Sequence, residues 1–465
     1  VVATPAGRGV VLADVVIDGT GNADIAAAAG APFIHTGGEF LSVQGTGLPP
    51  RALGASYTNT DYTFVDDSDM VDVWRLFVSA RQKYRGAFDL GQLIDTRERR
   101  RIKGEVVVSI LDQMNDRTYR DTIGMCKSDF DMHGFPVHPF FVLSHPQRKS
   151  LTTYIPYRCL LPANLEGMLV IGLGISVHRD ALPGTRMQPD IQNVGYAAGT
   201  AAAMAAKSGG MTRAIDVPAL QKHLAEIGNI PASAVGAKES YPMPDEKIAE
   251  AVRSLAKDYG GTAVVLAHRD KAVSMLEEAY RKAADEKTRR IYAHVLAVCG
   301  SSSGVDTLIA AVKAAEKWDR GWNFKGMGQY GWALSPLDRW IVALGMAGEK
   351  RAVPVIVEKL KMLTPASEFS HHRAVSLALE LIGDKSAAGP LAELLAEDGM
   401  AGHAMLQPAA GSDRSLPLRE IIIARALYRL GDHKHLARKS LESFTQDVRG
   451  HFARHASAIL QAGRK

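Results

Sequence analysis

The sequence of 465 residues predicts an α/β part that extends to about Gly210, followed by an all-α part built from helical repeats. In the first part, short apolar runs typical of strands alternate with glycine-rich loops and helices of small residues. From Lys247 onward, almost every segment has the apolar spacing of an amphipathic helix. A hydrophobic content of 46% and a charged content of 23% are ordinary for globular domains with large cores.

Charge and cysteine content exclude several classes of protein. The net charge of +5 is spread along the chain, so we expect no nucleic-acid partner. The three cysteines are far apart and form no CxxC pair, so we expect neither a disulfide framework nor a metal site. No apolar run is long enough to span a bilayer. We therefore expect a soluble protein, either cytoplasmic or exported to the periplasm.

The first elements are predicted in order along the chain. Residues 1–31 indicate a hairpin, a strand in "VVIDGTG" and a helix in "NADIAAAAGA" that Asn22 or Asp24 would cap. Strands are expected at 56–64 and 105–111. A helix is expected over 68–84, where the spacing places four apolar side chains on one face: Val71, Trp74, Phe77 and Val78.

The stretch "GMLVIGLGISVHRDALPGTRMQPD" carries the most informative pattern. An apolar strand, 168–171, breaks on Gly172-Leu173-Gly174, and a polar loop containing Arg186 leads into a small-residue helix over 191–206. Glycine at a strand end lets the backbone approach a ligand closely. Small residues recur in the helix at Gly195, Ala198, Gly199 and Ala202. This face permits either close packing on a sheet and nothing more, or a helix N-terminus directed at an anionic group.

The second half repeats a helix, a glycine break and a second helix. The breaks fall at intervals of about 35 to 50 residues, the range of helical-hairpin repeats, at Gly300, Gly348, Gly383 and Gly431. Each hairpin has an apolar face that its neighbour must cover, so we expect a HEAT-like solenoid, with an irregular helical domain as the alternative. His371 and His372 are expected on its surface. Four tryptophans would fill a gap between repeats or line a carbohydrate-binding surface: Trp318, Trp322, Trp332 and Trp340.

Several motifs of residues 1–210 together resemble the C-terminal part of a family of FAD-dependent oxidoreductases. They are "VVIDGTGNADIAAAAGAP", "RERRRIKGE", "DFDMHG" and the run from "YIPYRC" to "GYAAGTAAAMAA". The family's opening GxGxxG motif, which holds the ADP pyrophosphate, is not found in the sequence. We therefore expect a chain with a truncated N-terminus, in which an upstream segment or a second chain supplies the GxGxxG half of the FAD site.

The resemblance implies an incomplete FAD/NAD(P)-binding Rossmann-like α/β domain with an inserted β-rich substrate domain. The expected boundaries are 1–31 and 151–210 for the FAD-binding domain, 32–150 for the substrate or cap domain, 211–285 for a helical connector and 286–465 for the helical repeats. The implied cofactor is FAD. The residues that match the family's cofactor-binding positions, or lie beside them, are Asp18, Gly19, Gly21, Gly172, Gly174, Pro189, Gly195, Ala198 and Gly199.

The implied reaction moves a hydride between flavin and a hydroxylated small molecule, with a sugar as one candidate substrate. Such an oxidation needs a base, for which His178 and His133 are candidates. Arg186 or Arg158 could orient the substrate, although Arg186 could equally tether its own loop.

Two other functions remain open at this point. The chain could be a non-catalytic binding or assembly subunit that uses the solenoid, or a fumarate-reductase-like C=C reductase that uses His178 and Arg179. A homo-oligomer is compatible with each of these readings. Arg97, Arg100 and Arg101 are expected to form structural ion pairs.

Overall fold

The structure is a computed structural model that describes residues 2–41, 64–83, 100–132, 134–146, 150–323, 334–406 and 415–463. Residues 56–63 of the predicted strand, together with His133, Arg97 and Trp332, lie outside these residues. The chain forms two compact units, each built from three separate stretches. The first unit comprises Val1–His35, Glu98–Asp131 and Pro146–Pro242, and the second comprises Thr36–Arg97, Met132–His145 and Met243–Lys465.

The described residues of the first unit form four pairs of short strands. An antiparallel hairpin joins β1 (Val2–Thr4) to β2 (Gly7–Gly9), and a parallel pair joins β3 (Val16–Asp18) to β8 (Met168–Val170). Two further antiparallel pairs join β4 (Phe33–His35) to β5 (Arg100–Ile102), and β6 (Thr122–Ser128) to β7 (Leu151–Pro156). The expected strand at 105–111 is wrong. Within this stretch one isolated bridge forms, at Val108, and the helix α3 (Ile110–Met114) begins.

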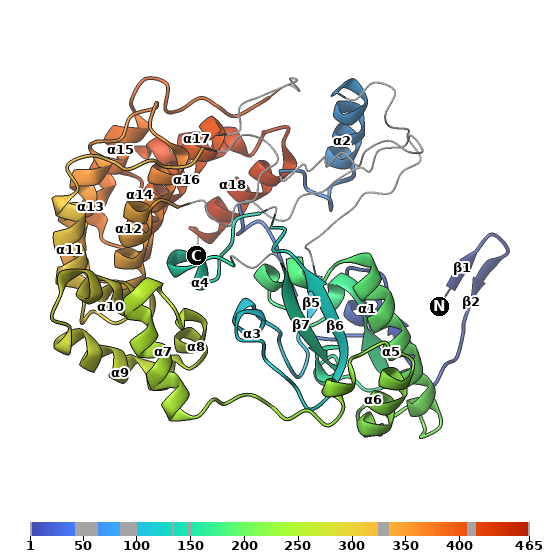
Figure 1. The fold of residues 1–465 in the computed structure, drawn as a ribbon. Helices are drawn as coiled ribbons and strands as arrows, with labels where there is room; N and C mark the ends of the chain where they lie inside the picture. The colour runs from blue at the N-terminus through green and yellow to red at the C-terminus, as the bar shows by residue number, and fades with distance from the viewer. Residues whose placement is uncertain are drawn as a thin grey trace. The chain divides into compact units, whose positions relative to one another are not determined.

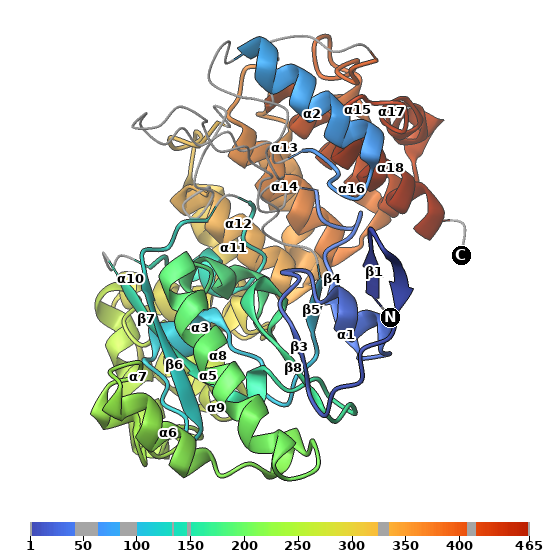
Figure 2. The same cartoon turned by 90° about the vertical axis from the view of Figure 1, so that its right-hand side faces the viewer.

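The helices of this unit pack against its strands. The long helix α5 (Gln188–Ala206) lies along the antiparallel pair of β6 and β7, as Figure 2 shows. The next helix in the chain is α6 (Val217–Glu226). The shorter helices are α1 (Asp24–Ala28) and α3 (Ile110–Met114). Gly124 of β6 permits the close approach of α5, since a Cβ there would lie 2.8 Å from Val194 Cγ2. The buried core includes Ile123, Leu169, Val194, Ala197, Ala198 and Ala201.

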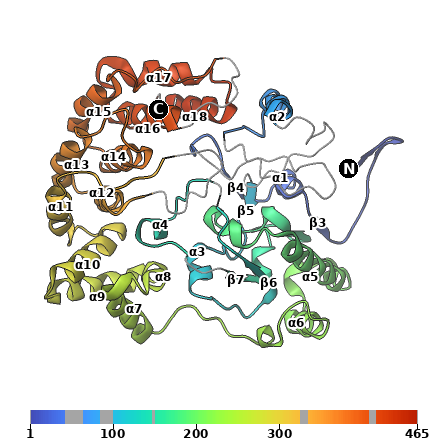
Figure 3. The same ribbon diagram turned by 45° about the horizontal axis from the view of Figure 1, so that its top comes forward.

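The second unit is helical in its described residues, apart from connecting turns. In the stretch Met243–Lys465 the helices are α7 (Asp245–Asp258), α8 (Thr262–Ala267), α9 (Arg269–Lys282), α10 (Glu286–Val298), α11 (Val305–Ala314), α12 (Pro336–Ala347), α13 (Val353–Leu360), α14 (Phe369–Ile382), α15 (Ala388–Leu395), α16 (Ser415–Leu430), α17 (Leu436–Phe444) and α18 (Gly450–Ala462). Helices α10, α12, α14 and α16 pack side by side in one row, while α11, α13, α15 and α17 form the other (Figures 1 and 3).

The predicted glycine breaks end these helices as expected. Gly300, Gly348, Gly383 and Gly431 all have positive φ and follow α10, α12, α14 and α16. Glycine adopts this left-handed conformation without the steric cost that a Cβ brings. The helical character of the C-terminal part is therefore confirmed, while its assignment to HEAT-like repeats stays a prediction.

Segments from the first half of the sequence complete the helical unit. Phe135 stacks on Phe369 of α14 with ring centroids 5.8 Å apart, and Phe64 stacks on Phe452 of α18 at 4.5 Å. The short helix α4 (Phe140–Leu143) packs against α10 and α12. The segment that leads into residue 41 also reaches α18, where Gly38 O accepts from His455 Nδ1 at 2.6 Å.

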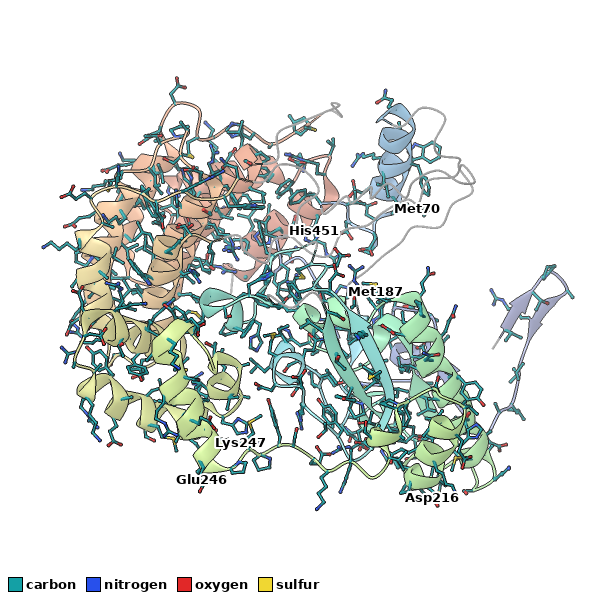
Figure 4. All side chains as sticks on the ribbon, in the orientation of Figure 1. Met70, Met187, Asp216, Glu246, Lys247 and His451 are labelled. Carbon is teal, nitrogen blue, oxygen red and sulfur yellow. The ribbon has the colours of Figure 1, made fainter. Side chains whose placement is uncertain are left out.

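Helix α2 (Met70–Lys83) confirms the helix predicted over 68–84. It attaches to α18 through a buried carboxylate, Asp72, whose Oδ2 accepts from Gly450 N at 3.0 Å. The predicted apolar face of α2 is exposed, with Trp74 at 61% and Val71 at 57%. Figure 4 labels Met70 at the start of this helix and His451 on α18. The boundaries of the two compact units follow spatial contacts. The domain boundaries expected from the sequence follow continuous stretches of chain and stay a prediction.

His371 and His372 correct an expectation. Both side chains are fully buried rather than on the surface. His371 Nδ1 lies 2.7 Å from Asp338 Oδ1, and its ring stacks on Trp318 at 4.3 Å. Burial, acting with the neighbouring Arg419 and His371, lowers the pKa of His372 to about 4, although a backbone hydrogen bond to Glu368 partly opposes the shift. Sequence spacing alone could not show that α14 lies between two other helices.

Candidate site at the ends of the parallel strands

The parallel strands β3 and β8 end at the same edge, with Asp18 paired to Val170. Ile171, the next residue, donates its N–H to Asp18 O at 3.0 Å and so continues the alignment into the loops. Carboxyl ends of parallel strands are where open α/β sheets bind ligands. We call residues 18–21, 171–174 and 188–199 the glycine junction.

Ile171 is the residue around which the glycine junction is built. A Cβ at Gly19 would lie 3.6 Å from Ile171 Cδ1, and a Cβ at Gly195 would lie 3.7 Å from the same atom. Gly172 has φ of +72°, and a Cβ there would meet Ile191 of α5 at 4.0 Å. Three segments that are far apart in the sequence therefore meet at this one side chain.

The predicted cofactor glycines differ in what faces them. At Gly174, a Cβ would lie 3.0 Å from Ala23 N and 3.1 Å from Val170 Cγ1, so this glycine is needed for packing. At Gly21 and Gly199, no atom lies within 4 Å of an ideal Cβ. Ala198 is fully buried in the core, because it points about 100° away from Gly199 around the helix axis. The small residues of α5 therefore serve both packing and an open face.

Asp18 is buried and fixes the loop that follows β3. Its Oδ1 accepts from Thr20 N at 3.0 Å and from Thr20 Oγ1 at 2.7 Å, and its Oδ2 accepts from Ala26 N at 2.8 Å. The predicted capping of α1 by Asn22 or Asp24 is wrong, because Ala23 occupies the N-cap and Asp18 supplies the acceptor for Ala26 N. The sequence-predicted cofactor residue Asp18 thus holds backbone rather than pointing into open space.

The N-terminus of α5 begins without a side-chain cap after Met187, which Figure 4 labels. Pro189 occupies the first turn and has no N–H to donate. Asp190, also in the first turn, accepts from Lys127 N at 3.2 Å through Oδ2, and burial raises the pKa of its carboxyl. The N–H groups of Gln188 and Asp190 belong to the first turn, whose donors have no partner within the helix.

His178 lies just beyond the glycine junction and is half-buried. Its ring Nδ1 accepts from Asp180 N at 3.2 Å. The backbone N–H of His178 donates to Val108 O at 2.8 Å. Burial, assisted by the nearby charges of Arg179 and Arg101, lowers the pKa of His178 to about 4. In the neutral ring an Nδ1 that accepts leaves the proton on Nε2, so His178 can donate from Nε2.

Two buried arginines lie near His178: Arg179, which the sequence offered only for the C=C reductase alternative, and Arg101, which was expected to be purely structural. Arg101 on β5 and Arg179 after His178 are both buried, and Arg179 Nε lies 3.6 Å from Asp180 Oδ1. Arg100, by contrast, forms the expected surface ion pair, with Asp24 at 2.7 Å. The signal in the sequence was the charged triplet His178-Arg179-Asp180, which directly follows an apolar strand and loop.

Arg186 and Arg158 both make ion pairs within the first unit. Arg186 Nη2 donates to Asp131 O at 2.9 Å and lies 3.0 Å from Asp131 Oδ2, so this arginine fastens the segment after β6. Arg158 pairs with Asp121 through two hydrogen bonds, at 3.0 Å and 2.7 Å, and also contacts Glu239. These contacts favour the tethering reading of Arg186 and leave Arg158 engaged by two carboxylates.

Residues 56–224 match the model of a family described as FAD dependent oxidoreductase. The matched range contains β8, η2 (Gly172–Gly174) and α5, whereas Asp18–Gly21 precedes it. The match supports an FAD-dependent oxidoreductase domain in this chain, which implies an α/β fold of the Rossmann type and an FAD cofactor.

Comparisons with curated proteins and with solved structures give no information on the function of this chain. The search of curated proteins gives no match. A solved structure similar to this chain is the complex of CpcE and CpcF of phycocyanin lyase from Nostoc sp. PCC7120, at 21% identity and a TM-score of 0.27. The likeness covers 40% of this chain and 63% of that one, and it carries no argument about function.

Among the residues that the structure describes, no helix is long and apolar enough to cross a membrane. The same residues contain no group of three or more His, Cys, Asp or Glu side chains arranged to hold a metal ion.

Proposed function

We propose that this chain supplies the flavin-ring half of an FAD-dependent oxidoreductase, which moves a hydride between FAD and a hydroxylated small molecule, with a sugar as one candidate substrate. The observation that carries the proposal is the meeting of Gly19, Gly172 and Gly195 around Ile171, at the carboxyl ends of β3 and β8. Two of these three glycines lie inside the residues that match the oxidoreductase family.

The residues at the junction fit a flat ring. An ideal Cβ at Gly21 or at Gly199 would meet no atom within 4 Å, so each position leaves space that a ligand could fill. Gly172 has a positive φ, which residues with a side chain rarely adopt. Bound FAD would supply the hydride acceptor. In this proposal, Gly172, Gly195 and Gly199 form the wall against the ring, and the first-turn N–H groups of α5 face its electron-rich edge.

His178 has a specific role in this proposal. Its lowered pKa keeps the ring neutral near pH 7, and Nδ1 is already engaged by Asp180 N. His178 therefore stays a candidate catalytic residue beside the glycine junction in its neutral form. His133 stays the candidate base from the sequence. Arg186 holds Asp131 through an ion pair at 3.0 Å and so fastens the segment after β6.

The rest of the FAD site would come from a further strand that carries a GxGxxG motif, in another chain or elsewhere in the same polypeptide. Among the described strands, β3 pairs with β8 alone. Its residues Val16 and Ile17 are 39% and 37% exposed. Parallel sheets are normally covered on both faces, so these apolar side chains favour an additional neighbour.

Flavin binding with a filled glycine tests the proposal. Gly199→Leu adds a side chain where a Cβ meets nothing within 4 Å, so the fold should tolerate it. Gly389→Leu on α15 is the matched control, because a Cβ there also meets nothing within 4 Å. We expect the wild type and the control to quench the fluorescence of riboflavin and FAD. We expect Gly199→Leu to bind both flavins at least about tenfold more weakly.

Two outcomes would contradict the proposal. One is a wild-type chain that quenches neither flavin. The other is equal affinity in all three proteins, which would show that the face at Gly199 does not contact the ring. Circular dichroism and thermal melting of each variant separate a loss of binding from a loss of fold.

A further inference from the structure

A second feature, in the helical unit and separate from the glycine junction, is the placement of Arg373 on α14. Its guanidinium carbon lies 4.8 Å from the centroid of the Phe135 ring. Phe135 stacks in turn on Phe369, with the two planes 18° apart. Both phenylalanines are buried. The contact with the Phe135 ring restricts where the guanidinium can lie, and Arg373 as a residue is half-buried.

Arg373 makes no hydrogen bond or ion pair with the residues that the structure describes. Burial, and then the positive charge of Arg425, lower the pKa of Arg373 to about 10, although Asp338 partly opposes the shift. Both Asp338 oxygens are engaged elsewhere, by His371 Nδ1 at 2.7 Å and by Ser335 N at 2.9 Å. Arg373 is thus a cation in desolvating surroundings without its own carboxylate, which is an unfavourable state.

Arg425 of the adjacent helix α16 adds to the positive charge. Its Nε donates to Glu380 Oε2 at 2.8 Å, and the other oxygen of Glu380 accepts from Arg429. One carboxylate therefore serves two arginines, and a third arginine, Arg373, lies close enough to feel Arg425. Like charges at this range disfavour each other unless an anion joins them.

We infer that Arg373 binds the oxyanion of a small molecule, a carboxylate or phosphate group, beside the Phe135 ring, while Arg425 on the neighbouring helix α16 adds positive charge. A guanidinium presents paired N–H groups that match two oxygens of such an anion, and charge-assisted hydrogen bonds of this kind are the strong ones. The contact with Phe135 restricts the Arg373 side chain before the anion arrives, so less entropy is lost on binding. The inference does not depend on flavin binding at the glycine junction.

Anion titrations of the full chain test this inference. The probes are inorganic phosphate and acetate, each compared with chloride at equal ionic strength, by calorimetry and thermal melting. We expect at least one oxyanion to bind and to raise the melting temperature of the wild type. Arg373→Met keeps most of the volume but removes the fork, and it should weaken that binding by about tenfold or more. The comparison of the two probes distinguishes a phosphate from a carboxylate ligand.

Two further variants keep the test decisive. Arg429→Met is the matched control, since Arg429 also contacts Glu380 but is 43% exposed, and it should bind the anion as the wild type does. Arg373→Lys retains the charge without the fork and should bind more weakly, and it stands in if Arg373→Met fails to fold. The inference is overturned if the wild type does not distinguish either oxyanion from chloride, or if both Arg373 variants bind with wild-type affinity.

Discussion

His178 Nδ1 accepts the backbone N–H of Asp180 at 3.2 Å, which fixes the imidazole as an Nε2–H donor. Burial lowers the pKa of this ring from 6.5 to about 4. Between these two values the unfolded chain binds a proton that the folded chain does not. The contribution of His178 to the free energy of unfolding therefore rises with pH from 4 to 6.5 and is lost on acidification.

We expect the His178 ring resonances in a nuclear magnetic resonance titration to stay those of the neutral ring from pH 8 down to about pH 5. A midpoint for His178 near 6.5 would show that burial does not control the charge of this ring.

Asp18 should be among the most sensitive carboxylates of the first unit. Asp18→Ala leaves the buried N–H of Ala26 and the N–H of Thr20 without their acceptor. We expect a loss of about 2–4 kcal/mol in the free energy of unfolding, measured by urea denaturation. Asp24→Ala is the control, because its ion pair with Arg100 is exposed and should be worth less than about 1 kcal/mol. Similar losses in the two variants would argue against the loop-holding role of Asp18.

Asp72 should give the second unit an acid-side dependence of opposite sign. Burial raises the pKa of Asp72 from 3.8 to about 6, against the hydrogen bonds from Asp66 N and Gly450 N. The folded state then keeps a proton that the unfolded state has released, so the free energy of unfolding falls as pH rises through this window. Asp72→Asn should flatten that part of the stability profile. A profile unchanged by the substitution would exclude Asp72 as its source.

The Asp338–His371 pair should be costly to break. Asp338 is fully buried, joins His371 at 2.7 Å and closes a capping box with Ser335 at the start of α12. Asp338→Ala removes one partner of a buried pair, and we expect a loss of about 3–5 kcal/mol by chemical denaturation. Asp306→Ala provides the comparison, since its pair with Arg351 is exposed and should contribute less than about 1 kcal/mol. A loss below that of the control would contradict the prediction.

Local sequence pattern predicted the elements well where one segment decides its own structure. The strand before Gly172, the helix α5 and the glycine ends of α10, α12, α14 and α16 follow from spacing and from glycine chemistry. The buried state of His371 did not follow, because it depends on Asp338 and Trp318, more than thirty residues away in the chain. Long-range packing of this kind leaves no periodic trace in one sequence.

The sequence likewise predicted part of the candidate site and could not predict the rest. Motifs identified Gly19, Gly172 and Gly195, and the structure shows that all three lie around Ile171. Spacing could not tell that Ala198 faces the core while Gly199 faces open space, since both belong to one run of small residues. Nor could it show that Arg101 and Arg179 are buried near His178, because arginines in loops are usually solvated.

The ring pairs Phe135–Phe369 and Phe64–Phe452 have a practical consequence for dissecting this protein. A recombinant product limited to residues 243–465 would lack one ring of each pair and would expose Phe369 and Phe452 to water. Such a product should aggregate or melt early. The helices after Met243 therefore do not form a complete module by themselves, because side chains from residues 36–97 and 132–145 belong to their core.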